Sequence, residues 1–331
     1  MATIREVAKV AGVSVGSVSR YLNGYRLKKE NMENIQQAIE ELQFKENIIA
    51  KGLKNKKTLA VGVVINSLTD VFATSIVSYL ETFLEQNNYS ILICDYNGDL
   101  DRLKIKLDFL YNRSVDGLVI FHLEEKLPIL EKMQNEGVFI VAVDAPIKDF
   151  TSDAVLIDNY AASYQATSKL IEYGHKQIGI IAGDTSKYIG KQRLLGYEMA
   201  MKEHGFYNQS FIKLSDYTRE TGRKKTLELL KEEHLTALYT VNYYTTLGAV
   251  QALRQLKLEV PEDISLVGFD YFETFDIFSP KLNVIVQPVK QIAEKISDVL
   301  LRKLQGIDID TYEKIELSTD ILWRESVKKI N

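Results

Sequence analysis

Short apolar runs recur along most of the chain, and their spacing limits the possible folds more than any other feature. Nine of them follow one another: Leu59–Ile65, Ser90–Cys94, Gly117–Phe121, Phe139–Val143, Val155–Ile157, Gln177–Ile181, Ala237–Val241, Ser265–Gly268 and Asn283–Val286. Amphipathic segments separate these runs. Apolar strands that alternate with helices are typical of parallel sheets covered on both faces. Because these units exceed one sheet, the sequence predicts two similar α/β lobes, with a binding crevice between them at the carboxyl ends of the strands.

The charge of the chain is segregated. Residues 1–57 contain 11 Lys and Arg against 6 Asp and Glu, a balance of +5, whereas the whole chain has 41 against 45 and a net charge of −4. The remaining residues therefore carry 30 basic and 39 acidic side chains, a balance of −9. A basic head on an acidic body indicates that a polyanion binds at one end only.

The head has the pattern of three short helices. Thr3 and Glu6 form a capping box at the first helix, Gly12 breaks that helix, and Ser14 can cap a second one. An apolar stripe predicts a third helix, with Met32, Ile35, Ile39 and Leu42. The core of such a head is minimal, and the spacing of the first two helices is that of a helix-turn-helix.

The second helix would present Val15, Gly16 and Arg20 on its exposed face. The Arg20 guanidinium can bind guanine O6 and N7 as a fork, whereas Ser14, Ser17 and Ser19 suit phosphate oxygens. The alternative is an ordinary three-helix domain with a few exposed basic residues.

Other function classes lack their motifs. The first apolar run leads into Asn66–Asp70 without a G-x-G-x-x-G turn, and no P-loop or G-x-S-x-G elbow occurs. The four histidines are far apart, and the single cysteine, Cys94, stands in an apolar run. We therefore predict no cofactor, no metal site and no enzymatic activity. Without an apolar run near 18 residues or a signal peptide, the chain is expected to be cytoplasmic and not bound to a membrane.

Polar residues follow several of the predicted strands and would meet in the crevice. These are Asp70, Asp95, Asp144, Asn242 and Asp270. Carboxylates and an amide suit vicinal hydroxyls, Arg193 can fork between two ring oxygens, and Phe72 and Tyr217 offer flat apolar faces. The alternative for a single aspartate is a helix N-cap, which is an equally good interpretation of Asp70 and Asp158.

Several motifs together resemble the lactose and galactose repressor (LacI/GalR) family of bacterial transcription regulators. They are Ile4–Asn23, Ala38–Leu42, Asn47–Leu53, Asp116–Val119, Asp158–Tyr160, Gly174–Ile178, Arg193–Tyr197, Asp263–Asp270 and Gln287–Pro288. The resemblance covers practically the whole chain. It implies a helix-turn-helix head joined to a two-lobed body like that of periplasmic binding proteins, with two parallel doubly wound sheets.

The resemblance also implies a division of the chain. We expect a DNA-binding head at residues 1–46, a hinge helix and linker at 47–57, and an effector-binding and dimerisation domain at 58–331. Lobe one would take about residues 58–157 and 287–317, and lobe two about 158–286 and 318–331. By resemblance the hinge helix forms when two subunits sit on an operator, and Leu53 wedges into a base step of the minor groove. The alternative for Leu53 is an ordinary linker leucine.

The predicted partners are a palindromic operator and a small-molecule effector. Predicted DNA contacts are Ser14, Val15, Gly16, Ser17, Ser19, Arg20, Asn23, Lys28, Asn31, Asn47, Ala50 and Leu53. Lys28 stands where the family commonly has a capping serine, and a lysine there can contact phosphate. The chain would bind the operator as a homodimer, and a corepressor protein is a further candidate partner.

By resemblance, Asp144, Arg193, Asn242 and Asp270 occupy the positions that bind the effector, with Phe72 and Tyr217 lining its face and Asp70 nearby. Ala145 replaces an arginine that many sugar-binding members have. The loss of one cation favours a neutral sugar over a sugar phosphate, unless Lys187 points inward. The rival hypotheses are a ligand-binding protein of transport type and a sugar-metabolising enzyme with the same body fold.

Overall fold

The computed structural model describes residues 2–22, 24–44 and 57–330, which form two compact units. The first unit is the head, with α1 (Ile4–Val10), α2 (Val15–Leu22) and α3 (Lys29–Glu41). The expected capping box of Thr3 and Glu6 is present. A small core holds the three helices together: Val7, Ala8, Ala11, Val18, Ile35 and Ala38 are buried. The predicted helix-turn-helix is confirmed.

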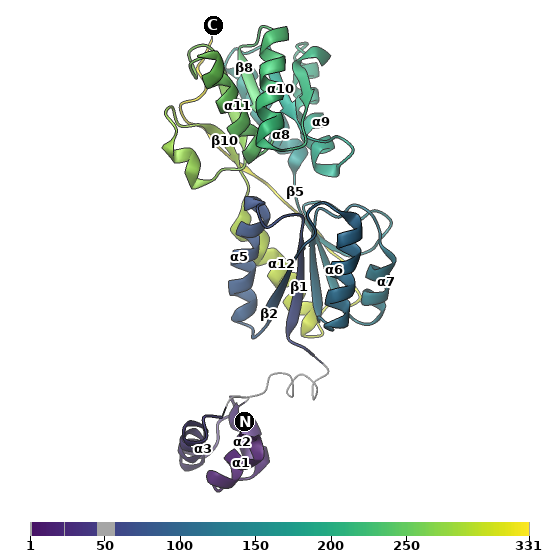
Figure 1. Ribbon diagram of the computed structural model, residues 1–331, viewed down its shortest axis with the longest axis vertical. Helices are drawn as coiled ribbons and strands as arrows, with labels where there is room; N and C mark the ends of the chain where they lie inside the picture. The colour runs from purple at the N-terminus through teal and green to yellow at the C-terminus, as the bar shows by residue number, and fades with distance from the viewer. Residues whose placement is uncertain (1, 23, 45–56, 331) are drawn as a thin grey trace. The chain divides into compact units, whose positions relative to one another are not determined.

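The second unit is the body, which contains two sheets of six strands each. The first sheet has the order β11-β5-β4-β3-β1-β2, and its strand pairs are all parallel. Its strands are β1 (Ala60–Ile65), β2 (Ser90–Asp95), β3 (Gly117–Phe121), β4 (Phe139–Val143), β5 (Asp153–Ile157) and β11 (Lys314–Leu317). With α5 (Val71–Glu85), α6 (Leu100–Asn112), α7 (Pro128–Asn135) and α12 (Val289–Leu304) it forms what we call lobe one. Figure 1 shows α5 and α12 on one side of this sheet and α6 and α7 on the other.

Lobe two contains the second sheet, with the order β12-β10-β9-β8-β6-β7. Its strands are β6 (Ile178–Ala182), β7 (Ile212–Leu214), β8 (Ala237–Thr240), β9 (Ser265–Phe269), β10 (Asn283–Val286) and β12 (Asp320–Leu322). Its helices are α8 (Asn159–Glu172), α9 (Tyr188–Glu203), α10 (Arg219–Glu232) and α11 (Tyr243–Leu256), with the 3-10 turns η1 (Gln209–Phe211) and η2 (Glu273–Ile277). The predicted class, two doubly wound lobes, is confirmed.

Strand periodicity explains how each sheet buries both faces. In β6, Ile178 and Ile180 pack with α8 and α9, whereas Ile181, one residue on, packs with α10 and α11. Successive side chains of a strand point to opposite faces, so a run that is apolar throughout can serve two helical layers.

Three of the strands have no counterpart among the predicted apolar runs. β7, β11 and β12 are three or four residues long and have the sequences IKL, KIEL and DIL. Each lies at the edge of its sheet, where one side of the strand has no neighbour, and β12 pairs antiparallel with β10. Short and partly polar edge strands do not give a continuous apolar signal.

The chain passes from one lobe to the other three times. It leaves lobe one after β5, returns after β10 to form α12 and β11, and ends in lobe two with β12. The connections lie at the carboxyl ends of β5, β10 and β11, so the strand ends of both sheets face the region between the lobes (Figure 1). In the part of the chain that the structure describes, no helix is long and apolar enough to cross a membrane.

Candidate functional site

The first candidate surface is the outward face of α2 in the head. Val15, Gly16 and Arg20 are exposed, as the sequence predicts, while Val18 is fully buried on the opposite side. The Ser14 hydroxyl accepts a hydrogen bond from the Ser17 backbone N–H at 3.1 Å. Ser14 therefore caps the start of α2. The outer face of α2 therefore does not pack against the core of the head and is accessible to a binding partner.

The remaining predicted DNA contacts are distributed around this helix. Ser17, Ser19 and Asn31 are half-buried, and Lys28 is exposed at the start of α3, where its side chain makes no capping hydrogen bond. Asn23, Asn47, Ala50 and Leu53 lie outside the described residues, and with them the predicted hinge helix. Tyr25 is 66% exposed just after α2, and the sequence reasoning did not select it.

The second candidate site lies where strands of both lobes end. His122 follows β3, Asp144 follows β4 and Asp270 follows β9, and all three adopt a left-handed backbone with φ of 56°, 68° and 66°. This conformation is uncommon for residues with a side chain, although Asn, Asp and His adopt it more readily than others. Such backbone strain is concentrated at ligand-binding sites and active sites. Each turn directs a polar side chain across the end of its sheet.

His122 links two carboxylates of lobe one. Its Nδ1 lies 3.3 Å from Asp144 Oδ2 and its Nε2 lies 3.6 Å from Asp70 Oδ2. Burial opposes a charge on the imidazole, but the hydrogen bond to Asp70 and the charges of both aspartates outweigh it and raise the pKa of His122. A ring whose two nitrogens both face carboxylate oxygens is best satisfied as an imidazolium, because only that form donates from both.

Arg193 is the cation that lobe two contributes to this cluster, as His122 is the cation of lobe one. It is 3% exposed, its Nε donates to Asn159 Oδ1 at 2.7 Å and its Nη1 donates to the Val241 carbonyl. The guanidinium also lies over the Phe269 ring, 3.7 Å from its centroid. Burial raises the pKa of Asp144, while the nearby charges of His122 and Arg193 act in the opposite direction.

Asp270 belongs to the same cluster. Its two carboxylate oxygens accept hydrogen bonds from the Gln287 side-chain amide and from the Tyr243 backbone N–H, the latter at 3.2 Å. Burial raises the pKa of Asp270, and Arg193 partly offsets this. Gln287 directly follows β10, so a residue at the end of a fourth strand also joins the site.

Tyr217 closes one side of the cluster. Its backbone is left-handed, with a φ of 67°, and its ring packs against Gly183 and Gly190. A Cβ added to Gly183 would lie 2.0 Å from the Tyr217 ring, and one added to Gly190 would lie 2.7 Å from its hydroxyl. Both glycines are therefore needed for the tyrosine to lie in this position.

Three buried polar atoms of this cluster have no hydrogen-bond partner. They are Asp144 Oδ1, the Tyr217 hydroxyl and Gln287 Oε1. Buried polar atoms are almost always paired, and an unpaired one is destabilising by roughly 1–3 kcal/mol. Gln287 Oε1 can only accept, and Asp144 Oδ1 accepts when the carboxyl group is ionised. The arrangement therefore calls for a molecule that donates hydrogen bonds at this position.

The other sequence-predicted cleft residues have different positions. Asp70 caps α5 through Phe72 N and Ala73 N, which confirms the N-cap interpretation, and its carboxylate also faces His122. Phe72 is 7% exposed. The Asn242 side chain caps α11 and donates to the Tyr217 carbonyl at 3.1 Å, so its amide is already engaged.

Two expectations do not match the arrangement. Lys187 is exposed at the start of α9, and the cation that contacts the acids is His122 instead. Asp95 stands on the edge strand β2, where its carboxylate accepts from Leu68 N and Asn97 N. Asp95 therefore organises the loops around Leu68 and Asn97, and its carboxylate is already engaged there.

Sequence reasoning missed His122, Asn159 and Gln287. His122 and Gln287 directly follow strands, and Asn159 comes two residues after β5, so the rule that selected Asp144 and Asp270 applies to them as well. Within the described residues, no group of three or more His, Cys, Asp or Glu has the geometry to hold a metal ion.

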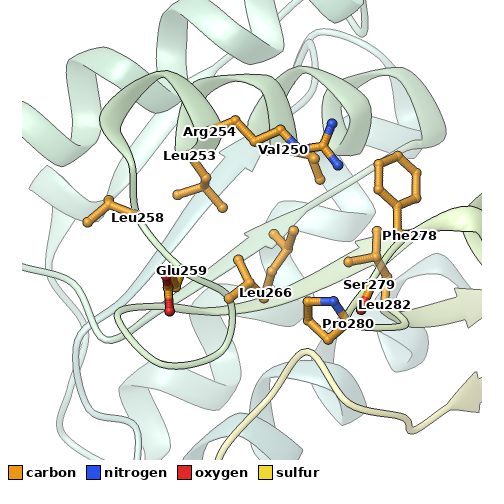
Figure 2. Close-up of a pocket in the computed structure, with 11 residues that line it drawn as sticks. Val250, Leu253, Arg254, Leu258, Glu259, Leu266, Phe278, Ser279, Pro280 and Leu282 are labelled. Atoms are coloured by element: carbon orange, nitrogen blue, oxygen red, sulfur yellow. The ribbon is translucent and has the colours of Figure 1, made fainter.

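A separate concavity of about 330 Å³ lies on lobe two (Figure 2). Leu253, Leu266 and Leu282 line it together with Phe278 and Arg254, whose guanidinium lies 5.6 Å from the Phe278 ring centroid. Its lining contains none of the residues of the strand-end cluster and none of the unpaired buried polar atoms. It is therefore separate from the strand-end cluster, although Arg254, Glu259 and Ser279 give its lining some polar groups.

Two family models match the chain and divide it in the same way as the structure. Residues 3–47 match the bacterial regulatory proteins of the lacI family, and residues 58–319 match the periplasmic binding proteins and sugar binding domain of the LacI family. The chain is also 32% identical to the HTH-type transcriptional repressor PurR of Actinobacillus pleuropneumoniae serotype 3 and 30% identical to that of Haemophilus influenzae, with each chain fully covered.

Solved structures show the same architecture. The transcriptional regulator CelR in complex with cellobiose is 26% identical, with a TM-score of 0.74, and the match covers 98% of this chain and 100% of that one. A lac repressor dimer bound to operator and an anti-inducer shares the fold with a TM-score of 0.86 at 24% identity, covering 99% of both chains. With a helix-turn-helix head and a two-lobed body, this chain belongs to the LacI family of bacterial regulatory proteins and is a DNA-binding transcription regulator.

Proposed function

We propose that this chain represses transcription by binding a palindromic operator as a homodimer, with α2 in the major groove. The exposed face of α2 and the positive charge of residues 1–57 support this assignment. Arg20 would contact a base edge, and Ser14, Ser17 and Lys28 would contact phosphates. The sequence adds Asn23, Asn31 and the hinge residues Asn47, Ala50 and Leu53 to this proposed interface. Since its operator would lie on the chromosome, we assign the protein to the cytoplasm.

The cleft of the body would bind a small neutral effector that is rich in hydroxyl groups. The single observation that carries this assignment is the set of three unpaired buried polar atoms on Asp144, Tyr217 and Gln287. Gln287 Oε1 can only accept, and Asp144 Oδ1 accepts when its carboxyl group is ionised, so a molecule that donates hydrogen bonds suits these positions.

Electrostatics further limits the effector. The carboxylates of Asp70, Asp144 and Asp270 outnumber the cations Arg193 and His122, and an anion placed among them would be repelled. A sugar offers several hydroxyl donors without charge. The bound cellobiose of CelR, at 26% identity, supports a ligand of this class.

The proposed activity is binding, with no chemical step. An effector that prefers one arrangement of the two lobes shifts the equilibrium between arrangements, and a paired movement of the lobes changes the fit of the two heads to the operator. A tenfold change in operator affinity requires a coupling free energy of only about 1.4 kcal/mol.

A thermal-shift screen of the whole chain tests the effector class. Neutral mono- and disaccharides should include a compound that stabilises the body, by about 2.7 kcal/mol at 100 times its dissociation constant, while sugar phosphates and sugar acids should not. Asp144→Asn should abolish that stabilisation, because it replaces a carboxylate oxygen that accepts a hydrogen bond. Asp101→Asn, at an exposed aspartate of α6, is the matched control outside the cluster. Stabilisation by the anionic compounds alone would contradict the proposal.

A further inference from the structure

The N-terminus of α9 is capped by a residue of the other lobe. Lys187 holds the N-cap position, but its side chain makes no capping hydrogen bond. Instead, the backbone N–H of Tyr188, the first residue of α9, donates to Glu124 Oε1 at 2.9 Å. Glu124 lies in lobe one, in the loop that follows β3. The first N–H groups of a helix have no partner within the helix and carry a partial positive charge, so a carboxylate stabilises them.

This arrangement sets α9 apart from most helices of the body. Five of the others carry a capping side chain of their own: Asp70 for α5, Asp99 for α6, Asp158 for α8, Thr218 for α10 and Asn242 for α11. Like α9, the helices α7 and α12 lack a side-chain cap at their N-cap residues, Leu127 and Pro288. Of these three helices, α9 is the one that carries Arg193, the cation of lobe two in the cluster.

Glu124 is well placed to connect the lobes. Its backbone carbonyl accepts from Lys148 N at 2.9 Å, which holds the loop against lobe one. Two residues before it, His122 contacts Asp70 and Asp144. A second hydrogen bond between the lobes joins the Tyr244 hydroxyl of α11 to the Thr69 carbonyl at 2.6 Å. Both hydrogen bonds require the two lobes to lie as close together as they do in this structure, and we call this the closed arrangement.

We propose that Glu124 is a positioning residue that couples lobe closure to the order of the first turn of α9. When the lobes separate, α9 loses its cap, because Lys187 cannot replace it. When they close, the cap forms and the helix that carries Arg193 is fixed in place. This inference goes beyond the proposed function, since it requires no effector and no operator.

Hydrogen exchange of the full chain tests the cap. Glu124→Ala should make the amides of residues 188–191 exchange about tenfold faster, since loss of an N-cap is a change of this size. The first turn of α10, which Thr218 caps within lobe two, should not change. Glu125→Ala is the matched control, because Glu125 is the exposed neighbour of Glu124. Unchanged exchange in Glu124→Ala would overturn the proposal.

A rescue variant separates the cap from lobe closure. Lys187→Ser gives α9 a capping side chain from its own lobe, so added to Glu124→Ala it should restore slow exchange. Closure is measured as the distance between spin labels at the exposed positions Asp108 of α6 and Lys231 of α10, in a Cys94→Ala chain diluted with unlabelled subunits. In the Glu124→Ala chain, the distribution of label-to-label distances should gain a longer component. That component should remain when Lys187→Ser is added to Glu124→Ala. An unchanged distance in Glu124→Ala, or one that Lys187→Ser restores, would overturn the proposal.

Discussion

The head and the body of this protein place their functional side chains in opposite ways. The head keeps six small or aliphatic residues buried and leaves Val15, Gly16 and Arg20 on its surface. The body instead buries the charged residues of its strand-end cluster, with Asp144 and Arg193 each 3% exposed. A surface that reads a large polyanion can be built from one helix, whereas a cleft that selects a small molecule needs groups from many strands held away from water.

The largest effect is expected from Arg193→Ala in the body. The change removes a buried guanidinium that donates to Asn159 Oδ1 and the Val241 carbonyl and whose charge acts on Asp144 and Asp270. Each buried acceptor left without a donor is destabilising by roughly 1–3 kcal/mol, and the two carboxyl groups also lose a nearby positive charge. Denaturant unfolding measures this loss. Arg223→Ala, which removes an exposed pair with Glu220, should change the free energy of unfolding by less than about 1 kcal/mol. If the alanine variant does not fold, Arg193→Lys should show a smaller loss of the same sign. Equal losses at positions 193 and 223 would contradict the contrast between buried and exposed charges.

Val18→Ala should have a large effect that is confined to the head. Val18 is fully buried in a core of only six residues, so loss of its methyl groups should destabilise the head by about 1–3 kcal/mol. Binding to a duplex should fall while the unfolding transition of the body stays in place, because the two units are compact separately. Val15→Ala, at a position 43% exposed, should leave the head folded. A shift of the body transition in Val18→Ala would show that the two units unfold together.

Arg20→Ala and Lys28→Ala divide the proposed surface of the head into two kinds of contact. If Arg20 makes a bidentate contact with a guanine, its loss should reduce the binding free-energy difference between the right and the wrong base at one position by about 1–3 kcal/mol. Loss of Lys28, a phosphate contact, should weaken all duplexes about equally and lower the slope of log affinity against log salt by about 1. Titration of a selected palindrome and of singly substituted duplexes distinguishes the two. Identical sequence profiles for both variants would exclude a base contact by Arg20.

The smallest effect concerns the pH dependence of the body. The folded-state pKa of His122 is raised by Asp70 and Asp144, against the effect of burial. The protonated imidazole therefore contributes stability that is fully present below the ordinary histidine pKa of about 6.5 and is lost as pH rises through the folded-state value. His122→Gln should flatten the fall in melting temperature above pH 6.5, whereas His234→Gln, at an exposed histidine, should not. If the melting temperature of the unmodified chain rose above pH 6.5 and His122→Gln removed that rise, the raised pKa of His122 would be contradicted.

The two regions also differ in how much could be predicted from the sequence. The head was predictable because its signals are local: the capping box of Thr3 and Glu6 and the turn at Gly12 need only residues within a few positions. The nine apolar runs likewise predicted most strands of the body. The edge strands β7, β11 and β12 were missed because their positions depend on a neighbour far away in the sequence.

The cleft could be predicted only in part, for the same reason. Position after a strand indicated Asp144 and Asp270, but it does not say which strands lie near the crevice, so the edge residue Asp95 was grouped with them. His122 was set aside because the four histidines are far apart in sequence. Its importance lies in its contacts with Asp70 and Asp144, which only the assembled sheet creates.

The left-handed turns at His122, Asp144 and Asp270 have a consequence for how this regulator can change its specificity over generations. Few residue types adopt such a backbone readily, chiefly Gly, Asn, Asp and His. Few residue types, most of them polar, can therefore replace His122, Asp144 or Asp270 without backbone strain. When such a regulator evolves to bind a different effector, substitutions are therefore expected at positions with ordinary backbone, such as Phe72 in the first turn of α5. The three strand-end positions should change only among those few residue types.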